Sequence, residues 1–165
     1  MRGVGVLEFG APDVLQVIDL PEVHAGPGEI RIRVHAASVN PTDLSVRNGA
    51  RAETLRQTAP PYVPGMDAAG VIDEIGPGTE TDLAVGTTVM AMVVPVGDHG
   101  AYRESIVLNM DSVIKAPEGF SYAEASTLPM NGLTARQSLD QLGLYPGQTI
   151  AVTGAAGGYG GYVIQ

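Results

Sequence analysis

Cysteine is absent from the 165-residue chain. A chain without cysteine forms no disulfide, builds no thiolate metal site and offers no thiol nucleophile. The absence also fits a reducing compartment, so we expect a cytoplasmic protein. Charged residues are scarce as well, at 16%, whereas hydrophobic residues make up 44%. This composition supports a packed core and argues against wholesale disorder.

Basic residues are few. Nine Lys and Arg stand against eighteen Asp and Glu, which gives a formal net charge of −9, and the basic residues are spread singly along the chain. Affinity for nucleic acid comes largely from clustered Lys and Arg, so we expect neither nucleic acid nor an anionic membrane as a partner. An anionic cofactor remains compatible, because backbone N–H groups can hold phosphate without basic side chains.

Long hydrophobic runs are also missing. The opening residues, MRGVGVLEFG, lack the continuous apolar region of a signal peptide. The longest apolar stretch, residues 88–96, is interrupted by Pro95 and is too short to span a bilayer.

The first 120 residues contain short apolar segments separated by glycine and proline. Residues 29–37 alternate between two faces, with Ile30 and Ile32 on one and Arg31 and Arg33 on the other, which predicts a half-buried strand. Further strands are predicted over residues 1–9, 15–20, 67–75, 87–94, 101–108 and 113–116. This regular spacing favours a barrel or a sandwich.

The pattern becomes helical after residue 120. Apolar residues recur at helical spacing between Ser121 and Leu142, and Ser121 with Glu124 resembles a capping box. Gly132 weakens a single long helix, so one helix and two shorter ones are equally compatible with the pattern.

A glycine-rich loop lies near the end of the chain. A short strand is predicted over residues 149–153, followed by GAAGGYGG and the opening of a helix at residue 162. Ala155, Gly157 and Gly160 match the G-x-G-x-x-G fingerprint, with alanine in the first place. A flexible terminal loop is the simpler interpretation, but a strand before the glycines and a helix after them favour a dinucleotide phosphate site.

Five ordered motifs resemble the quinone oxidoreductase branch of the medium-chain dehydrogenase/reductase family. They are GPGE (26–29), HAASVNPTD (35–43), PGMDAAG (64–70), GLTA (132–135) and VTGAAGG (152–158). The resemblance implies a mainly β GroES-like barrel as the substrate domain, over residues 1–120. It further implies the beginning of an α/β Rossmann domain, cut short, over residues 121–165. The implied activity is the reduction of quinones or α,β-unsaturated carbonyls with NADPH, although NADH is also compatible.

Zinc-dependent members of the same family differ from this chain at informative positions. They place a zinc-binding Cys where this chain has Asn40, and a His-Glu pair where it has Met66-Asp67. The three histidines have no ligand-like spacing, so we expect no metal site. We interpret Asp67 as pocket polarity without a metal.

The resemblance assigns candidate site residues in both the expected substrate domain and the expected dinucleotide-binding part. Asn40 and Asp43 are the candidate catalytic residues: the Asn40 amide can bond the nicotinamide ribose or a substrate carbonyl, and Asp43 can orient substrate or water. The alternatives are an Asn-Pro turn residue and a helix N-cap, respectively. Candidate cofactor-binding residues are Asn40, Thr134, Gly157, Gly158, Tyr159 and Gly160. Thr134 is equally compatible with a hydroxyl buried in a helix.

Only four residues follow Gly161, whereas a Rossmann site needs further strands and a ribose-binding residue. We therefore expect the chain to be part of a longer protein and to form a homo-oligomer or to associate with a C-terminal part. Besides the small-molecule reductase, two alternatives stay open: a GroES-like interaction module without catalysis, and the enoyl-reductase domain of a fatty-acid or polyketide assembly line.

The first prediction concerns metal content. Because Asn40, Met66 and Asp67 occupy positions of zinc ligands in the related enzymes, elemental analysis of the purified protein should find no stoichiometric zinc, and chelators should leave its activity unchanged. One tightly bound zinc per chain would contradict this expectation.

Overall fold

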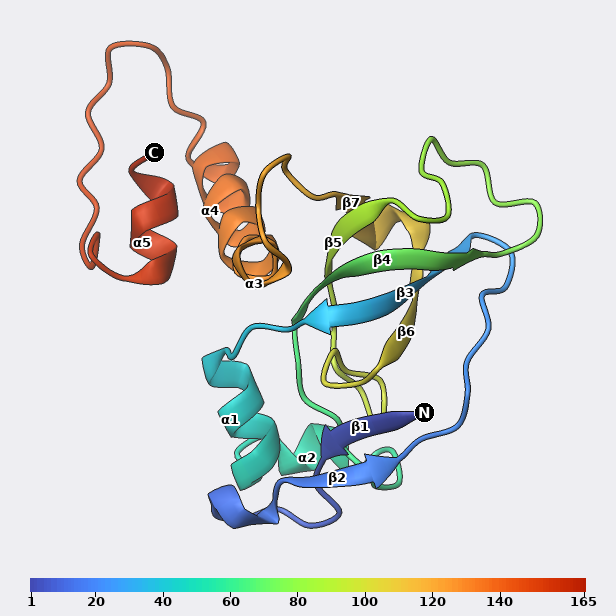
Figure 1. Ribbon diagram of the computed structural model, residues 1–165. Helices are drawn as coiled ribbons and strands as arrows, with labels where there is room; N and C mark the ends of the chain where they lie inside the picture. The colour runs from blue at the N-terminus through green and yellow to red at the C-terminus, as the bar shows by residue number, and fades with distance from the viewer.

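The computed structural model describes residues 1–165 and contains two sheets and five α-helices (Figure 1). The strands are β1 (Arg2–Gly5), β2 (Gln16–Asp19), β3 (Glu29–Ala36), β4 (Asp67–Ile75), β5 (Thr88–Met92), β6 (Ser105–Asn109) and β7 (Val113–Lys115). The helices are α1 (Pro41–Asn48), α2 (Ala52–Leu55), α3 (Tyr122–Ala125), α4 (Pro129–Leu142) and α5 (Gly158–Val163), with 3-10 turns η1 (Pro12–Val14) and η2 (Met110–Ser112).

The main sheet has the strand order β6-β3-β4-β5-β7, and every neighbouring pair is antiparallel. Its alternating strands turn one apolar face inward, so that Ile30, Ile32, Ile72, Val89 and Ile106 pack in a single cluster without solvent exposure. The predicted alternation over residues 29–37 is thus confirmed at its centre, where Ile30 and Ile32 are buried and Arg33 is exposed. The prediction of a mainly β fold is confirmed.

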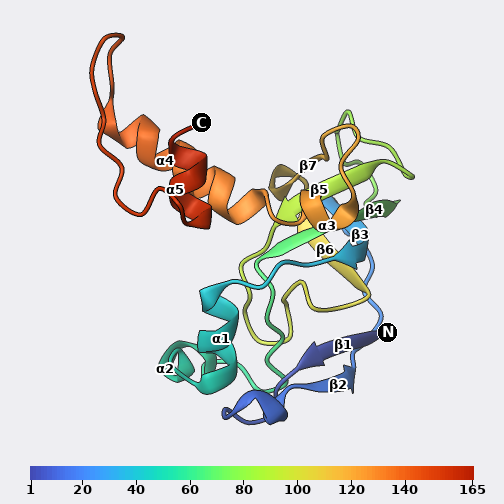
Figure 2. The ribbon, with the colours of Figure 1, turned by 60° about the vertical axis from the view of Figure 1, so that its left-hand side comes forward.

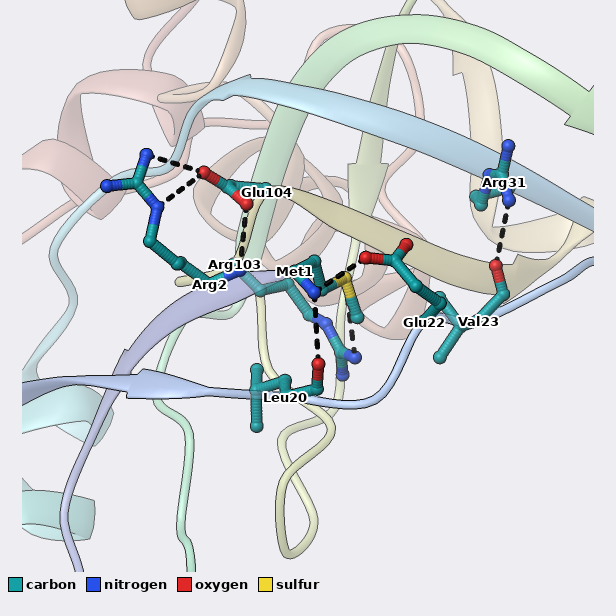
Figure 3. A network of polar contacts seen from close by, with 8 residues as sticks. All are labelled: Met1, Arg2, Leu20, Glu22, Val23, Arg31, Arg103 and Glu104. Atoms are coloured by element: carbon teal, nitrogen blue, oxygen red, sulfur yellow. Dashed lines mark hydrogen bonds and ion pairs between the residues drawn. The ribbon is translucent and has the colours of Figure 1, made fainter.

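The hairpin of β1 and β2 is joined to the main sheet by contacts from far along the chain (Figure 3). Arg2 pairs with Glu104 at 2.8 Å, and the Val4 N–H donates to the Tyr102 carbonyl at 2.7 Å. Residues 101–104 are therefore engaged with the hairpin and with the 62–65 segment, and β6 begins only at Ser105. The predicted strand over residues 101–108 was too long at its start for this reason.

A small helical layer connects β3 to β4. Helices α1 and α2 fill this connection, and their buried Val46 and Leu55 pack with Val6 and Tyr62. Tyr62 also stacks on the Phe9 ring at 5.0 Å between centroids. Tyr62 is therefore part of the core.

Two helices follow the last strand. The predicted capping box is present, because the Ser121 hydroxyl accepts from the Glu124 N–H while the Glu124 carboxylate accepts from the Ser121 N–H. The division into α3 and α4 occurs at Pro129, which fits the first helical position, whereas Gly132 lies inside α4. Both views show α4 and α5 leaving the sheet as one arm (Figure 2).

The predicted strand over residues 149–153 is wrong. These residues have no regular structure, and α5 begins at Gly158, earlier than the predicted opening at residue 162. A β-strand is stabilised by hydrogen bonds to a neighbouring strand, and the chain's two sheets include no segment beside residues 149–153. The apolar pattern alone therefore does not make these residues a strand.

None of the helices is both long enough and apolar enough to pass through a bilayer.

The buried face of β4 gives a stability prediction. Ile72 has no solvent exposure, so Ile72→Ala should lower the free energy of unfolding by about 2–5 kcal/mol. Ile114 on β7 is 55% exposed and serves as the matched control; Ile114→Ala should cost on the order of 0.5 kcal/mol. Urea unfolding of both variants measures the difference. Equal losses would show that the core is not where the structure puts it.

Candidate functional site

Asn40 stands where the chain passes from the sheet into a helix. After β3 ends at Ala36, Asn40 adopts an extended backbone (φ −111°, ψ 157°) and forms the N-cap of α1, with Pro41 in the first helical position. Asn and Pro suit these two places, since Asn favours caps and Pro has a fixed helical φ. The backbone of Asn40 is thus that of a helix N-cap and not of a turn residue.

The amide of Asn40 is held in one orientation. Its Nδ2 donates to Asp67 Oδ2 at 2.7 Å and to Ser38 Oγ at 3.1 Å, and the residue is only 8% exposed. A carboxylate offers only acceptors, so turning the amide over would bring two oxygens together. The Asp43 N–H donates to the Asn40 backbone carbonyl at 2.9 Å. The side-chain atom that Asn40 can offer to a ligand is therefore Oδ1, which is an acceptor.

Asp43 braces the same turn from the first turn of α1. Its Oδ2 accepts from the Asn40 N–H at 2.7 Å and from the Tyr102 hydroxyl at 3.3 Å, and its Oδ1 accepts from the Gly65 N–H at 2.7 Å. The alternative that Asp43 is the N-cap itself is wrong by three residues. Pro41 fixes the start of the helix, so Asp43 occupies the third helical position and reaches back to the cap.

Gly65 can reach Asp43 only because it lacks a side chain. Its φ is +109°, and a Cβ at this position would lie 2.8 Å from both the backbone N and the Cβ of Ala101. A larger residue would be strained in that conformation and would push the N–H away from the carboxylate. The local structure thus explains why the first glycine of the PGMDAAG motif, Gly65, is a glycine.

Burial dominates the electrostatics of this turn. It raises the pKa of Asp43 above its ordinary value of 3.8, and the negative charge of Asp67 adds to the rise, while hydrogen bonds from Asn40, Gly65 and Tyr102 oppose it. Burial and the charge of Asp43 also raise the pKa of Tyr102. Tyr102 therefore stays protonated and remains a hydrogen-bond donor to Asp43.

Asp67 connects this turn to the helical arm. The residue is 1% exposed; its Oδ2 accepts from Asn40 and from the Ser38 hydroxyl, and its Oδ1 accepts from the Met130 N–H at 2.7 Å. Met130 is the second residue of α4, so its N–H is one of those that a helix leaves unpaired at its N-terminus.

From Met130 a path of hydrogen bonds continues along α4 to the glycine loop. Thr134 Oγ1 donates to the Met130 carbonyl at 2.6 Å, and Ser138 Oγ donates to the Thr134 carbonyl at 2.8 Å. The Tyr159 hydroxyl then donates to Ser138 Oγ at 2.9 Å. Thr134 and Tyr159 thus join Asn40 in one connected set. The Thr134 hydroxyl bonds its own helix, but it is exposed and not buried as the alternative interpretation had it.

The glycine loop is closed tightly around its turn. Gly154 has a φ of +69°, and a Cβ on Gly160 would lie 2.3 Å from the Gly154 carbonyl oxygen. Gly157 is the N-cap of α5 and has no side-chain cap, and the Gly161 N–H makes the first bond back into the helix. The N–H groups of Gly158, Tyr159 and Gly160 therefore have no acceptor within α5, which suits the oxygens of a pyrophosphate.

The histidines take no part in this site. His24 pairs with Glu74, His35 stacks on Tyr122, and His99 Nε2 contacts the Val107 carbonyl. No group of three His, Cys, Asp or Glu side chains is arranged to hold a metal ion.

A hollow of about 440 Å³ lies on the surface between β1, β2 and the end of β3. It contains none of the predicted site residues, although Tyr102 forms part of its wall. We place the site at the polar network, because that network joins the candidate residues.

Sequence reasoning missed Ser38, Tyr102 and the backbone N–H of Met130. Ser38 lies inside the HAASVNPTD motif, so its closeness to Asn40 in sequence was a usable signal. Tyr102 comes from a segment 59 positions beyond Asp43, and a backbone donor leaves no trace in residue type.

A comparison with known proteins identifies the family of the chain. Residues 26–118 match the model of the alcohol dehydrogenase GroES-like domain. The chain belongs to this family. The chain is 31% identical to the quinone oxidoreductase of Mus musculus, over 97% of this chain and 47% of the relative.

Solved structures show the same likeness. The quinone oxidoreductase of Coxiella burnetii superposes on this chain with a TM-score of 0.85 at 33% identity. The match covers 99% of this chain and 52% of that structure. A mycobacterial protein solved as a complex with NADPH superposes with a TM-score of 0.79 at 30% identity, over 99% of this chain and 48% of that structure. The chain spans about half the length of the relatives it matches.

The raised pKa of Asp43 gives a pH-dependent prediction. A carboxyl group with a raised folded-state pKa contributes stability that is complete below its ordinary value of 3.8 and is lost as the pH rises through the folded value. The free energy of unfolding of the wild type, relative to Asp43→Asn, should therefore fall as the pH rises from 3.8. Urea unfolding across this range measures the slope; a difference that grows with pH would contradict the assignment.

Proposed function

We propose that the chain belongs to an NADPH-dependent oxidoreductase that reduces quinones or α,β-unsaturated carbonyls by hydride transfer. In this proposal residues 1–120 form the substrate domain and residues 121–165 begin the dinucleotide-binding domain. The relatives support the reaction class, and the mycobacterial complex supports the cofactor. The observation that carries the proposal is the hydrogen-bonded path from the glycine loop through α4 to Asn40, because one dinucleotide has to be held at both its phosphates and its nicotinamide end.

The loop end of this path fits the phosphates. The N–H groups of Gly158, Tyr159 and Gly160 would hold the pyrophosphate, with the positive end of the α5 dipole beside it. Gly160 lets α5 approach the Gly154 turn more closely than any side chain would permit. Positive side chains are not required there, which is consistent with the net charge of −9.

The other end of the path fits the nicotinamide riboside. Asn40 would present Oδ1 to a hydroxyl or amide N–H, because Nδ2 is engaged by Asp67 and Ser38. Asp43 keeps the Asn40 backbone and the Gly65 segment in register, so its role in the proposal is to support Asn40. Thr134 on α4 would lie between the two ends.

When bound, the reduced nicotinamide supplies the hydride, and the protein supplies position and electrostatics. Both oxygens of Asp43 are engaged as acceptors, and the Tyr102 hydroxyl is directed at Asp43 and the Ser38 carbonyl. These residues are therefore not placed to act as a general acid. Conjugated acceptors suit such a site, since hydride adds to the β-carbon while the carbonyl oxygen takes the charge and then a proton from solvent.

The intact protein should oxidise NADPH with small quinones or enones and hardly at all with simple ketones. The loss of the absorbance of reduced nicotinamide measures this activity. Asn40→Ala should lower kcat/KM by about tenfold, the loss expected for one hydrogen bond. Asn48→Ala is the matched control, because Asn48 is exposed at the end of α1 and bonds only the nearby Ala50 N–H.

Two results would contradict the proposal. An Asn40→Ala variant with unchanged kinetics would show that Asn40 has only a structural role, as the N-cap of α1. If the protein fails to oxidise NADPH when quinones, enones and enoyl thioesters are each supplied, the result would favour the GroES-like interaction module without catalysis.

A further inference from the structure

Asp67 is an unusual residue for its surroundings. It is fully buried at the start of β4, and the two residues after it, Ala68 and Ala69, are buried and apolar. Its hydrogen-bond partners are a hydroxyl, an amide and a backbone N–H, and it takes part in no ion pair. A carboxylate without a cation is costly to bury, and packing of the sheet does not require one there.

The two oxygens of Asp67 serve two different parts of the molecule. Oδ1 accepts from Met130 at the N-terminus of α4, where the N-cap residue, Leu128, makes no side-chain cap. Oδ2 accepts from the Asn40 amide and the Ser38 hydroxyl on the connection after β3. A negative charge is favourable at the start of a helix, so one carboxylate both caps the arm and fixes the site amide.

We propose that Asp67 is a positioning residue that sets the orientation of the Asn40 amide relative to the helix leading to the glycine loop. The proposal rests on the proposed function, since it assigns to Asn40 a role toward the nicotinamide end of a dinucleotide. It also makes that role specific. With Nδ2 held by Asp67, Asn40 recognises a donor such as a ribose hydroxyl or a carboxamide N–H, and it does not bind a substrate carbonyl.

Exchanging the two side chains tests this role. In Asp67→Asn, the new amide can still accept from the Met130 N–H through its oxygen, but its NH₂ faces the NH₂ of Asn40. Relief of that conflict turns the Asn40 amide and presents a donor to the ligand. In the double variant Asn40→Asp/Asp67→Asn, the amide at 67 donates to the carboxylate at 40, and the second oxygen at 40 is again an acceptor.

The expected kinetics separate positioning from stabilisation. Asp67→Asn should lower kcat/KM for NADPH at least tenfold, and the double exchange should recover most of that loss even though each single change is harmful. Asp73→Asn is the control on the same strand: Asp73 bonds Arg31 Nε at 2.8 Å and lies outside the site. It should lower the unfolding temperature while leaving kcat/KM unchanged.

The outcomes distinguish this inference from the function beneath it. A wild-type protein that does not oxidise NADPH overturns the proposed function and this inference with it. An active wild type whose double exchange is no better than the two single variants combined overturns the positioning role alone, because a carboxylate needed only to cap α4 is not restored by moving the charge to residue 40. Recovery by the double exchange supports the inference.

Discussion

The buried carboxylate of Asp67 is the contact on which the arrangement of the site depends. One of its oxygens accepts a hydrogen bond from the Met130 N–H in the first turn of α4, and the other accepts from the side chains of Asn40 and Ser38. The five-stranded sheet gives this carboxylate a fixed place at the start of β4, and α4 continues from it toward the glycine loop. Two parts of the chain that look separate in Figure 1 thereby share one polar junction.

Local conformation supplies the precision that such a junction needs. Pro41 fixes where α1 begins, which places Asn40 at the cap and Asp43 one turn behind it. The left-handed conformation of Gly65 turns its N–H toward Asp43, and the Tyr102 hydroxyl, from a distant segment of the sequence, also donates to Asp43. Burial then keeps Tyr102 protonated, so that its hydroxyl stays a donor. Each of these groups is positioned by backbone geometry before a ligand arrives, which is how a site lowers the cost of ordering.

Sequence patterns predicted the elements whose order is local and missed those that depend on partners. The alternation around Ile30 and Ile32 and the capping box of Ser121 and Glu124 are properties of a few neighbouring residues, and both are present. Residues 149–153 carry an apolar pattern but pair with no strand, because strand formation needs a neighbour as well as a pattern. For the site, motif residues such as Asn40 could be named from sequence, whereas Tyr102 and the Met130 N–H could not, since only folding brings them near. The orientation of the Asn40 amide likewise follows from Asp67, not from residue type.

The most direct test of the account is an NMR titration of the protein as encoded with NADPH. The signals to follow are the side-chain amide of Asn40 and the backbone N–H groups of Met130 and Gly160. All three signals should shift together, with the same midpoint, because one dinucleotide engages both ends of the path. A shift of Gly160 alone, with Asn40 and Met130 unchanged at saturation, would contradict it.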